Sequence, residues 1–431
     1  MHRKSMTAVV ITLLLAVTVQ AAEPLVVFAF DQNLDALLRI EDRNGDGDTL
    51  DAGECVIYFN DAPPVTGLDN SQGLYALGAR SAMATDNFAP DNIVFMNDLN
   101  GDGDAFDTGE ASVWFDGSLP GGYTLTNPVT LTPGPGGAWF IIDNNTLDDT
   151  NPEAVYRLED LNMDGDVNDE GEVTLYYELA PAGDSFAAVT FDIEFDAAGA
   201  GYILDIASAH PTRIDRIDPD GETKLEYINT NTLYSLTGVV LNDVSGEMGY
   251  NPATNEIVTS GYRGNYVVLL LAFKDRNGNN RIDAANEVRI IWDEELHAEH
   301  YNTGSPRDIF FAPDGTVLWV DALSDRLWRM EDLNGDRDFN DAGEIWYIYD
   351  ADEASLAGQP NAVNLLSVSA APACPADLDG DGDTDIADLA ELLSNYGMAS
   401  GAVQGDGDLD GDGDVDLSDL AALLAVYGTT C

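Results

Sequence analysis

Residues 42–54 read DRNGDGDTLDAGE, and this segment decides the fold because it recurs along the chain. Four further copies begin at equivalent aspartates: Asp98, Asp160, Asp275 and Asp332. Successive copies start 56, 62, 115 and 57 residues apart, so the longest interval holds one degenerate unit. That unit is expected near Ile217, where Asp218–Gly221 shortens the segment to a turn. The chain therefore contains six units.

Each unit has the same pattern of short strands, clearest in the last one. Apolar and aromatic runs separated by turn residues predict four strands: Asp308–Phe311, Thr316–Asp321, Arg326–Met330 and Ile345–Tyr349. The acidic segment lies between the third and the fourth. Six repeats of four strands are typical of an all-β six-bladed propeller.

A propeller has to close its ring, and the two ends of the repeat region indicate how. The first unit begins at Leu25–Phe30 and is one strand short, whereas an extra strand is expected at Ala362–Ser369 after the sixth unit. Pairing these two segments would complete the first blade and leave no open sheet edge there. The alternative, an open β-solenoid, predicts no such orphan strand.

The composition limits the class of protein. The 431 residues include 78 Asp and Glu against 18 Lys and Arg, a formal charge of -60. A nucleic-acid binder needs a basic face, so this class is excluded, and an anionic membrane surface is disfavoured. Hydrophobic residues make up 45%, enough for a sizeable core. The clustered carboxylates would repel one another unless bound cations neutralise them.

The N-terminus predicts secretion. Met1–Ala21 has a basic start, an apolar run of about 13 residues and a small-residue cleavage site, as in a secretory signal peptide. The apolar run is too short to span a bilayer. The expected domains are the signal peptide at 1–21, the propeller at 22–370 and a small C-terminal domain at 371–431.

The acidic segments have the chemistry of calcium loops. Oxygen side chains at alternate positions of a tight loop can converge on one Ca²⁺ ion, and a glycine such as Gly47 permits the sharp turn. The alternative for a single copy is a polar hairpin tip, since Asn, Asp and Gly favour turns. Four near-identical, highly charged copies favour calcium, and the variant loop is expected to bind more weakly. The candidate ligands are Asp42, Asn44, Asp46, Asp48, Asp51, Glu54, Asp98, Asn100, Asp102, Asp104, Asp107, Glu110, Asp160, Asn162, Asp164, Asp166, Asp169, Glu172, Asp275, Asn277, Asn279, Asp283, Glu287, Asp332, Asn334, Asp336, Asp338, Asp341 and Glu344.

Two known kinds of module resemble parts of this chain. The strand-turn phrase from Pro306 to Asp321 resembles blades of the NHL and SMP-30-like propeller families. From Cys374 onward, two copies of an Asp-rich loop followed by a short helix resemble a type I dockerin, a pair of half EF-hands around two calcium ions. The helices are expected at Leu389–Tyr396 and Leu420–Tyr427. The resemblance implies calcium ligands at Asp377, Asp379, Asp381, Asp388, Asp408, Asp410, Asp412 and Asp419.

The dockerin resemblance also implies a partner. Dockerins bind cohesin modules, and the recognition positions of the family fall on Ile386, Ala387, Leu417 and Ser418. The resemblance places the two ends of the module together, which implies a disulfide between Cys374 and Cys431. Cys55 is then expected to be a buried thiol on a strand. Chains that join an acidic propeller to such a module look like secreted proteins of Planctomycetes-type bacteria.

No catalytic motif stands out in the sequence. It contains no nucleophile elbow, zinc-protease helix or phosphate loop. His297 and His300 lie near several glutamates, but a solvated turn between blades explains them more simply than a metal site. Two functions remain: a secreted binding or scaffold protein with a polysaccharide or cell-surface ligand at the propeller, which is favoured, and an extracellular hydrolase acting on polysaccharide or ester substrates. Polar groups converging at the channel mouth would favour catalysis, and an apolar or plugged channel would exclude it.

Overall fold

The structure is a computed structural model. It describes residues 25–60, 68–87, 91–144, 152–180, 190–206, 210–242, 247–264, 267–297, 306–312, 315–322, 324–362, 365–370, 376–378, 384–398, 407, 409 and 415–428. Cys374, Cys431, Asp379, Asp381, Asp408, Asp410, Asp412 and His300 lie outside this part, as does the proposed signal peptide.

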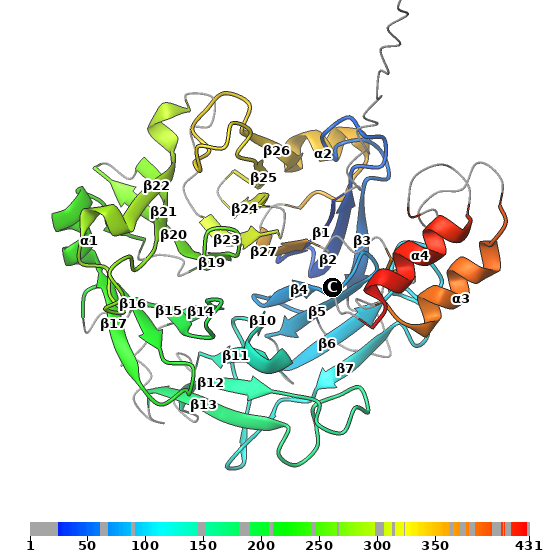
Figure 1. Cartoon of the computed structure of the whole chain (residues 1–431), viewed down its shortest axis with the longest axis horizontal. Coiled ribbons are helices and arrows are strands. Elements are labelled where there is room, and N and C mark those ends of the chain that lie inside the picture. Colours follow the sequence, from blue (N-terminus) through cyan, green and yellow to red (C-terminus); the bar gives the residue numbers. More distant parts are fainter. Residues whose placement is uncertain are drawn as a thin grey trace, which may run out of the picture.

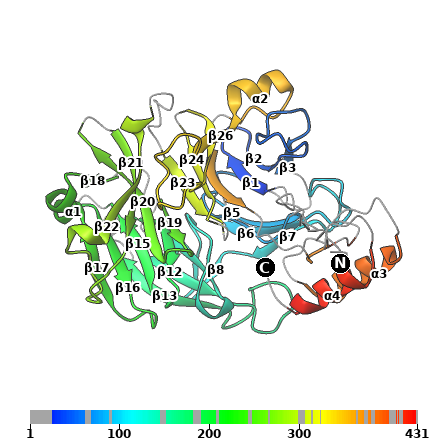
Figure 2. The same ribbon diagram turned by 45° about the horizontal axis from the view of Figure 1, so that its top comes forward.

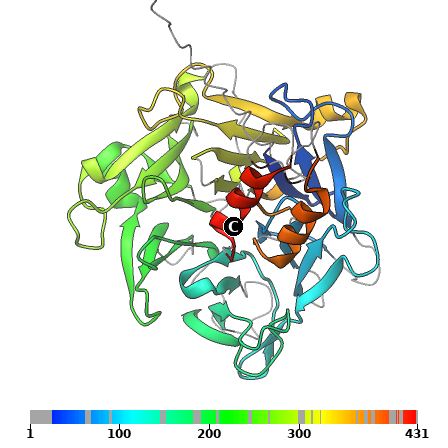
Figure 3. The same cartoon turned by 45° about the vertical axis from the view of Figure 1, so that its right-hand side comes forward.

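Within the described residues, six antiparallel sheets surround a common axis as the blades of a propeller (Figures 1 and 3). The prediction of a six-bladed β-propeller is confirmed. From the innermost strand outward, the first blade contains β27 (Leu365–Ala370), β1 (Val26–Asp31), β2 (Ala36–Glu41) and β3 (Cys55–Asn60), and the second contains β4 (Leu74–Ala76), β5 (Ser81–Asp86), β6 (Asn92–Asn97) and β7 (Ala111–Phe115). The third contains β10 (Thr132–Pro133), β11 (Trp139–Asp143), β12 (Glu153–Leu158) and β13 (Val173–Ala180), and the fourth contains β14 (Thr190–Phe195), β15 (Gly201–Asp205), β16 (Arg213–Ile217) and β17 (Lys224–Asn229). The fifth contains β18 (Val240–Leu241) and β19 (Met248–Asn251), then β20 (Glu256–Arg263), β21 (Val267–Phe273) and β22 (Val288–Asp293), and the sixth contains β23 (Pro306–Phe311), β24 (Val317–Asp321), β25 (Arg326–Met330) and β26 (Ile345–Asp350).

The remaining elements are short. The hairpin of β8 (Ser118–Leu119) and β9 (Tyr123–Thr124) follows the second blade, and α1 (Thr230–Thr237) follows the fourth. After β26, α2 (Ala351–Ala357) lies at the outer edge of the ring (Figure 2). The fifth blade departs from the expected pattern, because both β18 and β19 pair with β20 and the sheet has five strands.

The ring closes where the sequence predicted. β27 pairs antiparallel with β1, with Phe28 opposite Ser369, so one blade combines strands from both ends of the repeat region. The Ser369 hydroxyl also accepts a 2.9 Å hydrogen bond from the backbone N–H of Ala76 in the second blade. The open solenoid is therefore wrong, because the C-terminal strand has a partner at the N-terminus.

The core lies between neighbouring blades. Six clusters of buried apolar side chains are found in the described part of the ring, one at each junction between blades. Trp292 of the fifth blade, for example, meets Trp319 of the sixth edge to face at 4.9 Å. The second strand of a blade is covered on both faces, and all six residues of β1 are buried for this reason. The outermost strand β3 contains both buried and half-buried residues instead.

The C-terminal part forms two similar helices, α3 (Ile386–Asn395) and α4 (Leu417–Val426), which pack through Leu392 and Leu423. Both helices begin three residues earlier than predicted. Asp385 and Asp416 cap them, each side chain accepting a hydrogen bond from a backbone N–H of the first turn. None of the described helices is long and apolar enough to cross a membrane.

Candidate functional site

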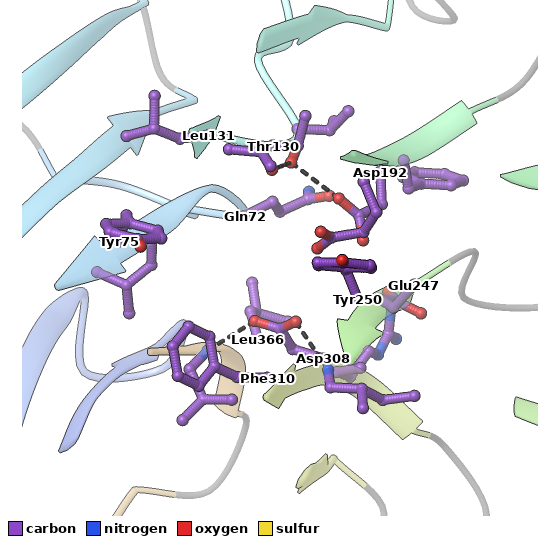
Figure 4. A pocket seen from close by; sticks show the side chains of 18 of the residues that line it. Gln72, Tyr75, Thr130, Leu131, Asp192, Glu247, Tyr250, Asp308, Phe310 and Leu366 are labelled. Atoms are coloured by element: carbon purple, nitrogen blue, oxygen red, sulfur yellow. Dashed lines mark hydrogen bonds between the residues drawn. The ribbon is translucent and has the colours of Figure 1, made fainter. Parts of the chain in front are cut away.

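The propeller axis holds a cavity of about 510 Å³. The first strands of all six blades contribute to its wall, so it is the central channel of the ring (Figure 4). The volume lies within the range of small-molecule sites, roughly 300–1,000 Å³. None of its residues is recognisable as a site residue in the sequence, because its wall brings together single positions far apart in the chain.

Asp192 on β14 joins three blades across the channel wall. Its Oδ1 accepts a 2.9 Å hydrogen bond from the Thr130 hydroxyl of the third blade, and its Oδ2 accepts a 3.0 Å bond from the backbone N–H of Met248 in the fifth. Burial raises the pKa of this carboxyl to about 6, although both hydrogen bonds oppose the shift.

Asp308 on β23 lies at the ring closure, in a position equivalent to that of Asp192 on β14. Its two oxygens accept backbone N–H groups of Ile309, at 2.8 Å, and Val368 of the closing strand, at 2.7 Å. Figure 4 shows this carboxyl pointing into the channel opposite Asp192. Burial raises the pKa of Asp308 to about 8, and the nearby charge of Asp192 adds to the rise.

Glu194 is the third acid of the wall. It lies two residues after Asp192, so both side chains extend from the same face of β14 toward the axis. Burial raises its pKa well above the usual value, and the charges of Asp192 and Asp308 raise it further. Three carboxyl groups therefore influence one another inside one cavity.

The rest of the wall is mixed in character. Glu247 and Arg307 add charge, and the rings of Tyr75, Tyr250 and Phe310 add aromatic surface (Figure 4). The Nε atom of Arg307 is buried without a hydrogen-bond partner among the described residues. The channel is thus neither apolar nor plugged within the part that the structure describes, and it combines ionisable groups with flat apolar surfaces.

The predicted calcium loops lie at the other functional region, between the third and fourth strands of five blades. In the loop that begins at Asp42, both carboxylate oxygens of Asp42 accept backbone N–H groups, at 2.7 and 2.9 Å. Buried Glu54 accepts three more, from Arg43, Asn44 and Asp51. The first and last acids of the segment therefore fix the loop backbone. Glu110, Glu172, Glu287 and Glu344 bind their loops in the same way.

Three other side chains converge in each of the four strong loops. The Asn44 amide Nδ2 lies 3.2 Å from Asp46 Oδ2 and 2.6 Å from Asp51 Oδ2. The same triads are Asn100, Asp102 and Asp107; Asn162, Asp164 and Asp169; and Asn334, Asp336 and Asp341. The Asn44 oxygen accepts the Asp46 N–H at 2.8 Å, and a half-turn of the amide would turn this oxygen toward the two carboxylates. Such oxygens are the kind of ligand that Ca²⁺ takes, and they would supply part of its six to eight ligands.

No described group of three His, Cys, Asp or Glu side chains is arranged to hold a metal ion. This agrees with the loops, where two acids and one asparagine converge. In the variant loop, Asn277 and Asn279 both donate to Asp283, which leaves one carboxylate at the point of convergence. Asp48 and its equivalents Asp104, Asp166 and Asp338 accept a backbone N–H two residues on.

The eighth residue of each loop docks on the preceding blade. The Val167 N–H donates a 3.1 Å hydrogen bond to the Trp114 carbonyl on β7, and its side chain is fully buried. The same contact joins Thr49 to Ile348, Ala105 to Tyr58, Ile282 to Tyr227 and Phe339 to Ile291. Each loop therefore connects two neighbouring blades. This contact between blades was not predicted from the sequence.

The fourth blade lacks such a loop, as predicted. A turn joins β16 to β17, in which the Asp218 N–H donates to the Thr223 carbonyl at 2.9 Å. The Tyr176 hydroxyl of the third blade donates to the Asp218 carbonyl at 3.2 Å. Basic side chains neutralise acids of this blade instead: Arg213 and Lys224 each lie 3.0 Å from Asp215.

The predicted partner-binding positions occupy the first turns of the two C-terminal helices. Ile386 and Leu417 are exposed to 63% and 67%. Asp388 and Asp419 are buried, and each closes a capping box while accepting a second backbone N–H, from Leu378 and Leu409. Ala387 and Ser418 lie beside them in the same turns. Asp377 is the remaining described candidate ligand of this region.

Two expectations about single residues have clear outcomes. Cys55 is a free, buried thiol at the start of β3, as predicted, and burial raises its pKa to about 12. The expectation that His297 lies in a solvated turn is wrong. This side chain is buried and stacks on Trp292 with ring centroids 5.9 Å apart, because the turn after β22 folds back over the indole.

Comparisons with known proteins find similarity only to solved structures. No protein-family model and no curated protein matches the sequence. Solved structures with a similar backbone include a protein of unknown function from Bacteroides caccae, with 10% identity and TM-score 0.45 over 81% of this chain and 99% of that one. An aldose sugar dehydrogenase from Streptomyces coelicolor has 13% identity and TM-score 0.43 over 67% and 84%. A protein of unknown function from Bacteroides thetaiotaomicron has 12% identity and TM-score 0.42; 65% of this chain spans 60% of its length.

Proposed function

We propose that this chain is a secreted, calcium-stabilised propeller that binds a small ligand in its central channel and attaches to a cohesin-like protein partner through its C-terminal helices. The observation that carries the proposal is the convergence of Asp192, Glu194 and Asp308 with aromatic rings around one cavity of about 510 Å³. Carboxyl groups in a cavity whose pKa values are raised by burial and by neighbouring charges are candidates for a functional site.

Calcium has a structural role in this proposal. The asparagine and two aspartates that converge in each strong loop would hold the ion; in the first loop these are Asn44, Asp46 and Asp51. A bound cation would remove the repulsion between the two carboxylates. Because the same loop docks on the preceding blade through Thr49, the ion would also stabilise the junction between blades.

The channel proposal is tested by thermal melting of the full chain in calcium, with a panel of neutral glycosides, lactones and amines. At least one compound is expected to raise the melting temperature of the native chain but not of Gln72→Trp, which narrows the channel at its wall. If no compound separates the two proteins, the channel is not a ligand site.

The second candidate function is hydrolysis, and one specific observation favours it. Asp192 and Asp308 have pKa values raised to about 6 and about 8, on either side of neutral pH. Groups in this range serve as general acids and bases. Asp308→Asn would then abolish product formation from an ester or glycoside while ligand binding persists. If the native chain binds the ligand without forming product, the hydrolase function is wrong and the binding function is retained.

The attachment proposal depends on the exposed apolar residues that begin α3 and α4. Ile386 and Leu417 hold equivalent places on the two similar helices, so either could serve as an anchor at a protein interface. Purified cohesin modules are expected to bind the full chain in calcium by calorimetry. Ile386→Asp combined with Leu417→Asp should abolish this binding, whereas unchanged affinity would contradict the assignment.

A further inference from the structure

Glu194 differs from the other two acids of the channel in its hydrogen bonding. Asp192 accepts hydrogen bonds from Thr130 and Met248 of the two neighbouring blades. Asp308 accepts one from Val368 of the closing strand and one from Ile309 of its own strand. In the part of the chain that the structure describes, the Glu194 carboxyl has no hydrogen-bond partner, although it lines the cavity. The Glu194 side chain is half-buried and faces the cavity, so its carboxyl group is open to a ligand that can pair with it.

The charges of the wall indicate which kind of ligand this is. Four carboxyl groups line the described part of the channel, those of Asp192, Glu194, Glu247 and Asp308, against the single guanidinium of Arg307. Such a cavity attracts cations and repels anions. A bare metal ion fits poorly, because no described set of three acidic side chains is arranged to hold one.

Aromatic rings in the channel wall further limit the chemical class of the ligand. Tyr75, Tyr250 and Phe310 line the same cavity. Tyr250 lies beside Asp192, and Tyr75 lies across the cavity from it (Figure 4). A cation over the face of such a ring gains about 0.5–2 kcal/mol, and the apolar part of an organic ligand can pack against the same surface. Carboxylate and aromatic groups together suit an organic ammonium ion better than a sugar or a hydrated metal ion.

We propose that Glu194 anchors an organic ammonium ligand in the central channel, with Tyr75, Tyr250 and Phe310 enclosing its apolar part. This inference rests on the proposed function, in which the channel is a ligand site. It adds the chemical class of the ligand and the residue that selects it.

Binding at this position is coupled to proton release. Glu194 is faced by Asp192 and Asp308, and the channel also contains Glu247, Arg307 and the two tyrosines. Burial and the two aspartates favour the protonated form of Glu194 in the free protein. An ammonium ion favours the carboxylate, so the proton is released on binding and affinity increases as the pH rises.

The test uses the full chain in calcium and a matched pair of probes, benzylamine and benzyl alcohol, which differ in charge and have similar shape. Calorimetry is expected to show benzylamine binding at least tenfold more tightly. Glu194→Gln should remove this preference. Glu222→Gln, an exposed acid of the same blade outside the channel, should leave the affinity within about twofold of the native value.

A second measurement needs no variant, in case Glu194→Gln does not fold. Benzylamine is titrated in two buffers of different ionisation enthalpy near pH 7, and the difference in heat should show release of a fraction of one proton. Equal binding of the two probes, or no proton release, overturns the inference. Neutral ligands that still bind in the channel would leave the proposed function standing, whereas no binding by any probe would overturn both.

Discussion

The backbone N–H of Phe339 lies 2.8 Å from the carbonyl oxygen of Ile291, and this hydrogen bond joins an acidic loop of the sixth blade to the outer strand of the fifth. The Phe339 ring is buried in the same junction, beside Trp292 and Trp319. Five of the six junctions carry this contact at the eighth residue of the loop. Each loop therefore has two structural features. Acidic side chains converge at its tip, and its eighth residue hydrogen-bonds to the neighbouring blade.

Removing calcium should loosen the four junctions that carry strong loops and leave the junction without a loop nearly unchanged. Chelation is expected to lower the melting temperature sharply, because the converging acids then repel one another. In hydrogen exchange, the amides of Thr49, Ala105, Val167 and Phe339 should lose protection. The Asp218 amide lies in the junction without a loop and serves as the internal control. An unchanged melting curve in excess chelator would contradict a calcium role.

Phe339→Ala should destabilise the chain by about 3 kcal/mol, since a buried ring leaves a cavity between two blades. Leu333→Ala in the same loop is the control, because Leu333 is 64% exposed and should change stability by less than about 0.5 kcal/mol. Denaturant unfolding in saturating calcium measures both. Equal effects would mean that the loop does not stabilise the junction.

Ser369→Ala tests the ring closure. The substitution leaves the buried N–H of Ala76 without its acceptor and should cost about 1–3 kcal/mol. Ser367 is buried on the same strand, and its hydroxyl oxygen has no partner among the described residues. Ser367→Ala is therefore expected to be neutral or slightly stabilising. The same denaturant titration compares the two, and a larger loss at Ser367 would refute this account of the closure.

The channel acids predict a stability that falls as pH rises. Burial raises the pKa of Asp308 to about 8 from a usual value near 3.8, so the folded chain keeps a proton that the unfolded chain has lost. The free energy of unfolding should therefore decrease between about pH 5 and pH 8 in saturating calcium. Asp308→Asn should flatten this dependence, and Glu222→Gln should not. Melting temperatures across this range provide the measurement.

The repeat made much of the fold predictable. A period set by Asp42 and its equivalents implied the number of blades, and an orphan strand after the last unit implied the closure through β27. Helix starts at Ile386 and Leu417 were predicted three residues too late, because the capping acids Asp385 and Asp416 were assigned to the loops. The buried position of His297 was also missed, since it depends on contact with Trp292.

The sequence by itself determined the blades, because strand periodicity and turn residues act over a few neighbouring positions, and it indicated calcium chemistry through the spacing of Asp42, Asn44 and Asp46. Tertiary structure alone decided the channel. Asp192, Glu194 and Asp308 are ordinary strand residues in the sequence, and only closure of the ring brings two distant blades to one axis. Their raised pKa values follow from burial and mutual repulsion in that shared space, which no local pattern encodes.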